Sequence, residues 1–469
     1  MRCCGCVIAI IFFLYSVSAQ AGDIHGSVDV GGWVAFNNLS DAPGFVVDDG
    51  VGNNHVQKRY SLLRLGLRLD AADLFDGGDG QRVNAHLDFD SLINPDERRY
   101  TLGVNDQFRQ ELRQLNVELP KMGGIADVWF GRQLVYEAGG ANFDGLRGVF
   151  HVGESVDIGL FGGLGVDPRN LAGYIGPAYR DNPFTLDFQT AGFYSSYRGE
   201  RIKADGGFES LFFKGHADRM TLFSQGFFNL DRVWSFSGFV RGALIGSRGL
   251  ENLNGTVTAR PTSRVTNNLS FERFRAFVFK KSNDSAIPVP TGISSSFVNN
   301  IDVDTSSYNT VKDHVMLRVF ERNFIFGAVS FTRRTFDDEN QMRYTIGYRD
   351  PRLFGSFADL KLQTDLIDNF RGFNAVLDGL LGYEWMESKL RLEGGATYFA
   401  NEREIFLSNL PTGQRQTDKE YALRGNAYFN PMREVSLIFA YTLYAETDAT
   451  NNDQVMRIHE IYLGTNFRF

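Results

Sequence analysis

The sequence of 469 residues contains few cysteines, few prolines and no long apolar run. Its only cysteines, Cys3, Cys4 and Cys6, all lie at the extreme N-terminus, so the rest of the chain can form no disulfide, thiolate nucleophile or cysteine-ligated metal site. Proline is limited to 12 residues. No apolar stretch reaches the roughly 20 residues that a transmembrane helix needs, which excludes a helical membrane protein.

An excess of positive charge is also missing. The chain carries 48 Lys and Arg residues against 56 Asp and Glu residues, for a formal net charge of -8, and its mean hydropathy is -0.22. This balance excludes a basic nucleic-acid binder, and we expect no nucleic-acid partner. A soluble chain of this length would normally show apolar residues at helical spacing, and almost none occur. The 50 Gly, 42 Phe and 18 Tyr residues argue against disorder.

The N-terminus has the order of a secretory signal. One positive charge at Arg2 precedes an apolar run from Val7 to Tyr15, which is followed by the small residues of Ala19-Gln20-Ala21. The run covers about nine residues, too few for a retained membrane anchor. We therefore predict that residues 1–21 are a signal peptide cut before Gly22, and that residues 22–469 are the mature protein.

From Asp23 onward, apolar and polar residues alternate in long segments separated by turns. Between residues 389 and 399, for example, one face holds Leu390, Leu392, Gly394, Ala396 and Tyr398. Soluble β-sandwiches and β-propellers alternate too, but their strands average about 5 to 6 residues, and no repeat of propeller length is present. A bilayer holds no water for open sheet edges, so these strands must close on themselves. The pattern predicts an all-β protein formed by a single transmembrane antiparallel up-and-down β-barrel without a plug domain.

We expect 22 strands, although 18 or 20 remain open because the hairpin boundaries are uncertain by several residues. The candidate strands are 24–37, 58–69, 82–92, 107–119, 125–135, 144–152, 156–166, 188–199, 203–214, 218–229, 233–244, 250–260, 265–280, 311–321, 324–335, 341–349, 354–364, 373–383, 389–400, 419–429, 433–446 and 455–469.

The connection lengths test this count independently. The long connections 38–57, 167–187, 281–310 and 401–418 all fall on one side of the barrel, and the short turns fall on the other. Outer-membrane barrels of Gram-negative bacteria use long extracellular loops and short periplasmic turns. Residues 70–81 are the exception, because they form a longer connection on the periplasmic side.

The C-terminal strand carries the strongest single signal. Its apolar face consists of Ile461, Leu463, Thr465, Phe467 and Phe469. This face resembles the terminal strand of bacterial outer-membrane barrels, which the barrel-assembly machinery reads. The resemblance implies that the chain lies in the cell outer membrane, with outer-membrane lipid and that machinery as partners.

The alternate face of each strand would line a lumen, since large barrels keep water inside. The candidate pore-lining residues are Arg64, Arg68, Asn84, His86, Asp88, Asp90, Arg318, Arg343, Arg349, Asp359, Lys361, Gln363, Arg391, Glu393 and Arg424. An excess of lumenal arginine would favour anionic solutes. The alternative is that these charges pair with Asp and Glu across the wall. Two connections are candidates to narrow the pore, residues 281–310 and the segment Tyr136 to Asn142.

Several early segments resemble a known family. They are Leu112-Arg113-Gln114, Val117-Glu118-Leu119-Pro120, Gly131-Arg132-Gln133 with Tyr136, and Phe143-Asp144-Gly145 with Arg147. They look like the early strands of outer-membrane porins, more specifically of alginate-export channels. The resemblance implies an arginine-rich lumen for an anionic polysaccharide. It covers a short part of the chain, and the expected strand number is higher than in those channels.

We therefore expect an outer-membrane porin-like channel for diffusion or export of small hydrophilic solutes, anionic ones included, or of a polymer. The alternative is a non-conducting structural barrel that serves as a scaffold or surface adhesion platform. Seven isolated histidines and the lack of a Gly-x-Ser-x-Gly elbow predict no enzyme, no cofactor and no metal site. The oligomeric state stays open.

Overall fold

A computed structural model describes residues 24–37, 45–48, 54–57, 59–74, 82–93, 108–165, 174–175, 188–245, 249–275, 307–335, 338–353, 356–369, 372–405, 414–447 and 455–469. The predicted signal peptide and most of the long connections, 276–306 among them, lie outside these ranges. Within them, no helix has the length and apolar character needed to cross a bilayer.

The described chain is almost entirely β-strand. The first half contains β1 (Ile24–Asn37), β2 (Phe45–Asp48), β3 (Asn54–Gln57), β4 (Arg59–Ala71), β5 (Asn84–Ile93), β6 (Phe108–Met122), β7 (Ala126–Val135), the 3-10 turn η1 (Tyr136–Ala138), β8 (Ala141–Val152), β9 (Val156–Gly165), β10 (Tyr174–Ile175), β11 (Phe188–Arg198), β12 (Ile202–Phe213) and β13 (His216–Asn229). The second half contains β14 (Trp234–Ile245), β15 (Gly249–Thr262), β16 (Val265–Arg275), β17 (Ser307–Arg318), β18 (Phe324–Arg334), β19 (Asn340–Asp350), β20 (Ala358–Asn369), β21 (Gly372–Trp385), β22 (Leu390–Ile405), β23 (Gln414–Met432), β24 (Val435–Thr447) and β25 (Val455–Arg468).

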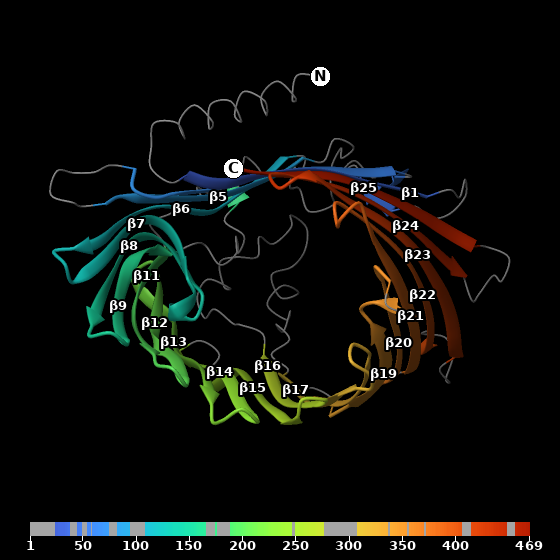
Figure 1. The fold of residues 1–469 in the computed structure, drawn as a ribbon. Coiled ribbons are helices and arrows are strands. Elements are labelled where there is room, and N and C mark those ends of the chain that lie inside the picture. Colours follow the sequence, from blue (N-terminus) through green and yellow to red (C-terminus); the bar gives the residue numbers. More distant parts are fainter. Residues whose placement is uncertain are drawn as a thin grey trace, which may run out of the picture.

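These strands form a closed antiparallel ring of 22 members (Figure 1). Each strand pairs with the next along the chain, and β25 closes the ring by pairing with β1. β2 and β3 pair only with each other, and β10 adds two residues to the side of β6. The predicted up-and-down barrel is therefore confirmed, and no described segment forms a plug domain.

The side-chain period of two places apolar residues outside the ring and polar residues inside it. On β4, Leu63 is 47 % exposed on the outer face, while Arg64 points inward to Asp90. On β19, Ile346 is 64 % exposed on the outer face. An apolar exterior around a ring without open edges is the arrangement that a bilayer requires. The chain is thus a transmembrane β-barrel.

Three β-bulges change which side chains reach the interior. A bulge leaves one residue without a partner on the neighbouring strand, so two successive side chains can point to the same side. The register shifts leave Arg113, Asp218 and Glu251 as the extra residues. Asp218 and Glu251 are fully buried, and Arg113 forms an ion pair with Asp90 at 3.0 Å. The bulges thus add charged groups to the interior wall.

All 22 predicted ring strands occur, with changes at their ends. β17 begins at Ser307, so the last four residues of the predicted loop 281–310 belong to a strand. Similarly, β23 begins at Gln414 and not at residue 419. The polar segment at the start of β23 shows no apolar alternation, but it pairs with residues 401–405 of β22. Backbone pairing with a neighbour extends these strands beyond the part that faces lipid.

The C-terminus lies against the start of β1. The backbone N–H of Gly26 donates to the carbonyl oxygen of Phe469 at 2.9 Å, and the N–H of Phe469 donates back to the carbonyl oxygen of Gly26 at 3.1 Å. Along β25, the outer face holds Ile461, Leu463, Thr465 and Phe467, and Leu463 is 59 % exposed. The Phe467 and Phe469 rings stack with centroids 6.1 Å apart. The residues predicted as an assembly signal thus form an apolar strip at the closing seam.

We expect the exchange Phe469→Ala to lower the amount of folded barrel in the outer membrane. The variant removes the terminal ring from the seam and leaves the backbone pairing in place. Heat-modifiable migration on gels measures the folded fraction. Arg468→Ala, on the lumenal face of the same strand, is the matched control and should fold like the parent. Equal folded fractions for both variants would contradict a role of Phe469 in assembly.

Candidate functional site

The tip of the β7–β8 hairpin bends into the lumen. β7 pairs with β6 only over the segment from residue 126 to residue 132. Its C-terminal end, residues 133–135, separates from β6 and leaves the wall. η1, at the tip, lies against the inner faces of β11 and β12 (Figure 1). The tip thus crosses over β9 on the inside of the barrel. The structure places the segment Tyr136 to Asn142, expected to narrow the pore, within the lumen.

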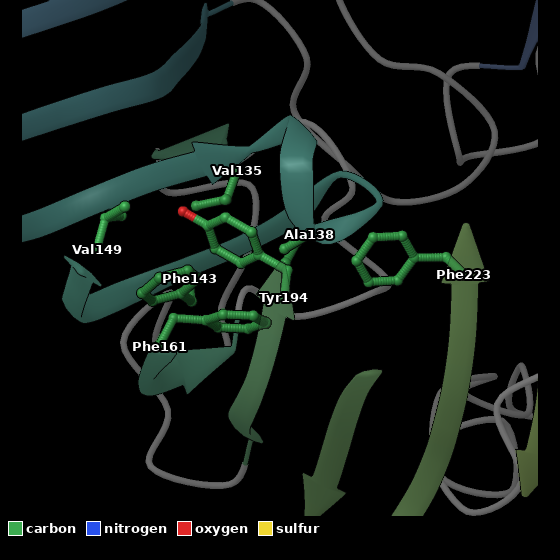
Figure 2. Close-up of a cluster of buried hydrophobic side chains, with 8 residues drawn as sticks. Val135, Ala138, Phe143, Val149, Phe161, Tyr194 and Phe223 are labelled. Carbon is green, nitrogen blue, oxygen red and sulfur yellow. The ribbon is translucent and has the colours of Figure 1, made fainter. Parts of the chain in front are cut away.

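A buried apolar cluster holds this tip against the inner wall. Its members are Val135, Ala138, Ala141, Phe143, Val149, Phe161, Tyr194 and Phe223. Figure 2 shows Tyr194 and Phe223 reaching Ala138 from the wall strands β11 and β13. Phe143 and Phe161 stack with ring centroids 5.1 Å apart. This cluster is a small hydrophobic core inside the barrel that stabilises the inserted position of the tip.

Polar contacts complement the cluster. Arg241 on β14 donates from Nη1 to the carbonyl oxygen of Gly139 at 3.2 Å. Arg147 on β8 donates from Nε to the hydroxyl of Tyr194 at 2.7 Å, and its guanidinium lies 4.6 Å from the centre of the Trp129 ring. Because a backbone carbonyl inside the lumen must find a donor or water, the Arg241 bond fixes the tip at a defined place on the wall.

The segments that resemble alginate-export channels build the base of this hairpin. Gly131 has a φ of 121°, which bends β7 where it leaves β6. Arg132 and Asp144 form a two-pronged ion pair, with Nε to Oδ1 at 2.7 Å and Nη2 to Oδ2 at 2.6 Å. Arg132 also donates from Nη1 to the carbonyl oxygen of Leu112 on β6 at 3.1 Å. These residues therefore fix the bend at the base of the β7–β8 hairpin, from which its tip extends into the lumen.

Two buried ion pairs support the wall beneath the tip. Arg219 and Glu251 lie 2.5 Å apart, and Arg241 and Glu209 lie 3.0 Å apart. Glu251 is fully buried, and the Arg219 side chain is only 8 % exposed. Removing one member of such a pair would leave an uncompensated buried charge, which typically costs roughly 3 to 5 kcal/mol. This part of the wall is thus structurally fixed.

The predicted pore-lining residues on β4 and β5 lie on the inner face and are paired. Arg64 binds Asp90 through both Nε and Nη2 at 2.9 Å, and Arg68 binds Asp88 at 3.0 Å. His86 lies between two carboxylates, 2.8 Å from that of Asp70 and 3.3 Å from that of Glu118. Asn84 also donates to Glu118 at 2.9 Å. The predicted residues on these two strands thus take part in cross-strand contacts.

Three predicted arginines on β19, β22 and β23 are paired as well. Arg343 lies 3.0 Å from Asp365, and Arg424 contacts Asp378. Arg391 lies 2.7 Å from Glu393 and 2.9 Å from Asp359. The alternative in which wall charges pair with each other thus describes most of the predicted arginines.

Three cations of the predicted set have no ion-pair partner within the described ranges. They are Arg318, Arg349 and Lys361, which lie near the periplasmic ends of β17, β19 and β20. Phe324 lies between two of them in the register, with the Arg318 guanidinium 5.5 Å from the centre of its ring. Lys361 lies opposite Arg349 on the neighbouring strand. The inner wall is therefore locally cationic at this position.

A recess of 650 Å³ opens at the same place. Its lining consists of His314, Met316, Phe324, Phe326, Arg349, Asp359, Lys361, Gln363, Leu380 and Arg391. Asp359 is the acid in this lining, and it forms an ion pair with Arg391. The recess therefore combines two unpaired cations with an apolar floor. In Figure 1, its strands lie across the ring from the inserted hairpin.

The structure also assigns interior positions to charged residues that the pattern analysis did not select as pore-lining. They are Arg113, Arg147, Glu209, Asp218, Arg219, Arg241 and Glu251. Arg147, Glu209 and Arg241 follow the alternation of their strands and could have been found from it. The bulged Arg113, Asp218 and Glu251 could not, because a bulge breaks the alternation that locates inward positions. Within the described ranges, no group of three His, Cys, Asp or Glu side chains could hold a metal ion.

Comparison with known proteins gives structural likeness only. No family model matches the chain, and no curated protein matches it. The chain is similar to the crystal structure of Pseudomonas aeruginosa OpdQ, with a TM-score of 0.43 and 8 % identity over 96 % of this chain and 99 % of that one. It is also similar to Acinetobacter baumannii OccAB4, with a TM-score of 0.41 and 8 % identity over 96 % and 99 % of the two chains. Identities and TM-scores this low assign neither a family nor a solute.

The architecture itself defines the class. A closed, even-numbered antiparallel barrel with an apolar exterior and a polar interior is the form of bacterial outer-membrane barrels, porins among them. The predicted porin class and outer-membrane location agree with this form.

We expect Gly139→Ala to release the inserted tip and raise single-channel conductance in planar bilayers. Gly139 has a φ of 72°, and an added Cβ would lie 2.9 Å from the Phe223 ring. Gly140→Ala is the matched control, because Gly140 has a φ of 86° and open space around it. Both variants carry the backbone cost of alanine at positive φ, roughly 1 kcal/mol. Equal conductance in both variants would show that the tip does not narrow the path.

Proposed function

We propose that this protein is a passive outer-membrane channel for small hydrophilic solutes and that it favours anions. The observation that carries the anion preference is the recess near the periplasmic end, where Arg349 and Lys361 have no acid partner in the described chain. Charges in a narrow aqueous passage set the field that a passing solute meets. Unpaired cations therefore contribute to selectivity far more than arginines neutralised by a neighbouring carboxylate.

The other arginines of the inner wall support the assignment of the anion preference to the recess, because their charges are neutralised by neighbouring acids. Arg64, Arg68, Arg343 and Arg424 each lie against a carboxylate. Opposite charges at contact distance cancel most of each other's field beyond a Debye length of about 8 Å. The overall net charge of -8 thus says little about the passage. The local imbalance at the recess decides the preference.

The apolar floor of the recess favours solutes with an apolar part. Met316, Phe324 and Phe326 lie beside the cations on the same wall. A solute with one anionic group and a small apolar body would place the anion at Lys361 and its body on these side chains. The inserted hairpin at the extracellular side favours small solutes over a polymer, because it occupies part of the lumen.

Planar-bilayer recording under a salt gradient tests this proposal. The parent protein should give discrete openings and a reversal potential on the anion side. Lys361→Glu should move the reversal potential towards cations, since it reverses a charge at the recess. Arg457→Glu is the matched control, because alternation on β25 places Arg457 on the outer face. A shift of equal size in both variants would contradict the assignment of the recess.

The same recordings decide between the channel and the alternative of a structural barrel. Folded, heat-modifiable protein that gives no openings would support a non-conducting scaffold or adhesion platform. The expectation that the chain is not an enzyme stays a prediction. Hydrolysis of phospholipid or peptide by the purified barrel, lost on a single Ser or His exchange, would overturn it.

A further inference from the structure

The exterior of the barrel changes character at the extracellular ends of β16 to β19. Four outward positions in direct register there are polar, in the order Arg273, Asn309, Arg333 and Asn340. We call these four residues the rim patch. Two residues closer to the bilayer centre, the same strands carry Phe271, Val311, Phe331 and Met342. The rim patch therefore borders a row of apolar side chains. Closer to the bilayer centre, Asp313 shares the outward face of Val311 and accepts a hydrogen bond from Asn267 at 2.8 Å.

Alternation along the strands places the rim patch outside the lumen. Phe271, Val311 and Phe331 are 37 %, 44 % and 40 % exposed on the apolar exterior. The residues between them and the patch point the other way, because the hydroxyls of Thr310 and Thr332 meet on the inner face at 2.9 Å. Arg273 and Arg333 therefore share the face of Phe271 and Phe331 and lie at the edge of the lipid-facing surface.

Neither arginine of the rim patch forms a buried ion pair within the described structure. The Nε of Arg273 is buried and donates no hydrogen bond within the described structure. Arg333 lies 2.9 Å from Asp338, but their side chains are 55 % and 73 % exposed. An exposed pair of this kind contributes only about 0.2 to 1 kcal/mol. Arg333 can therefore exchange this partner for a stronger one.

Among the described residues, the other acids near the extracellular ends of these strands are directed elsewhere or lie to the side of the rim patch. Glu339 pairs with Arg334 at 3.1 Å, and Glu272 alternates to the lumenal face of β16. Asp368 on β20 stands opposite Met342 and so flanks the patch beyond β19. The rim patch thus presents two guanidinium groups and two amides, with Asp338 as the acid in direct contact.

From this arrangement we infer that the rim patch binds the phosphate groups of the phosphorylated glycolipid in the outer leaflet of the outer membrane. A guanidinium matches a phosphate through two parallel hydrogen bonds, and amide groups supply further donors. The height is suitable, because headgroup phosphates lie where the apolar exterior ends. The acyl chains of the same molecule would cover Phe271, Val311 and Phe331. The patch therefore recognises both the charged and the apolar part of one lipid.

Binding of bisphosphorylated lipid A to the detergent-solubilised, folded barrel tests the inference, with native mass spectrometry as the readout. The double variant R273Q/R333Q should retain lipid A about tenfold less than the parent, since two charge-assisted contacts are lost. The matched control K312Q/R343Q removes two positive charges from the lumenal faces of β17 and β19. It should bind lipid A like the parent.

Three further probes identify the source of the phosphate. Lipid A without its phosphates should bind the parent as weakly as the intact lipid binds the double variant. Phosphatidylglycerol and inorganic phosphate should compete poorly, because neither combines two phosphates with the acyl chains of the glycolipid. Equal retention by the parent and the double variant, equal binding of dephosphorylated lipid A, or equally strong binding of phosphatidylglycerol would each overturn the inference. Unchanged conductance of the double variant would separate this site from the solute path.

Discussion

The constraint on which this structure depends is that a bilayer offers no hydrogen-bond partners to the backbone. Every strand must pair on both sides, and the ring closes only because β25 meets β1 along the register from Ser27–Arg468 to Asn37–Ile458. Closure then forces each side chain either outward or inward. The apolar exterior, the charged interior and the strip at the C-terminal seam all follow from that single requirement.

This constraint explains how much the sequence could predict. Alternation located all 22 ring strands, because lipid on one side and water on the other select opposite side chains at every step. The inward direction of Arg64, Arg343 and Arg424 followed from the same rule. Alternation cannot show which charges meet, because pairing depends on the register between strands. The contacts of Arg391 with Glu393 and Asp359 became visible only in the structure.

The inserted hairpin marks the second limit of sequence reasoning. Tyr136 to Asn142 was recognised as a candidate for narrowing the pore, but nothing in its sequence specified the surface that receives it. That surface is assembled from Tyr194, Phe223 and Arg241 on three separate strands. The bulges at Asp218 and Glu251 were also not predictable from alternation. Each bulge interrupts the period of two and so places an extra charged residue in the wall beneath the tip. The position of the tip therefore depends on long-range packing, and the positions of the bulged charges depend on local irregularity. The period of the sequence specifies neither.

The position of the hairpin has a geometric consequence for the bore. Among the described residues, the tip of the β7–β8 hairpin lies against β11 and β12 and is bonded to Arg241 on β14, so it forms a second layer over this part of the wall. The wall is therefore thicker at the tip, and the inner-face side chains beneath the tip are covered by polypeptide. A charged side chain beneath the tip is separated from the bore by the tip, so residues at the same depth of the barrel differ in how directly they face the bore.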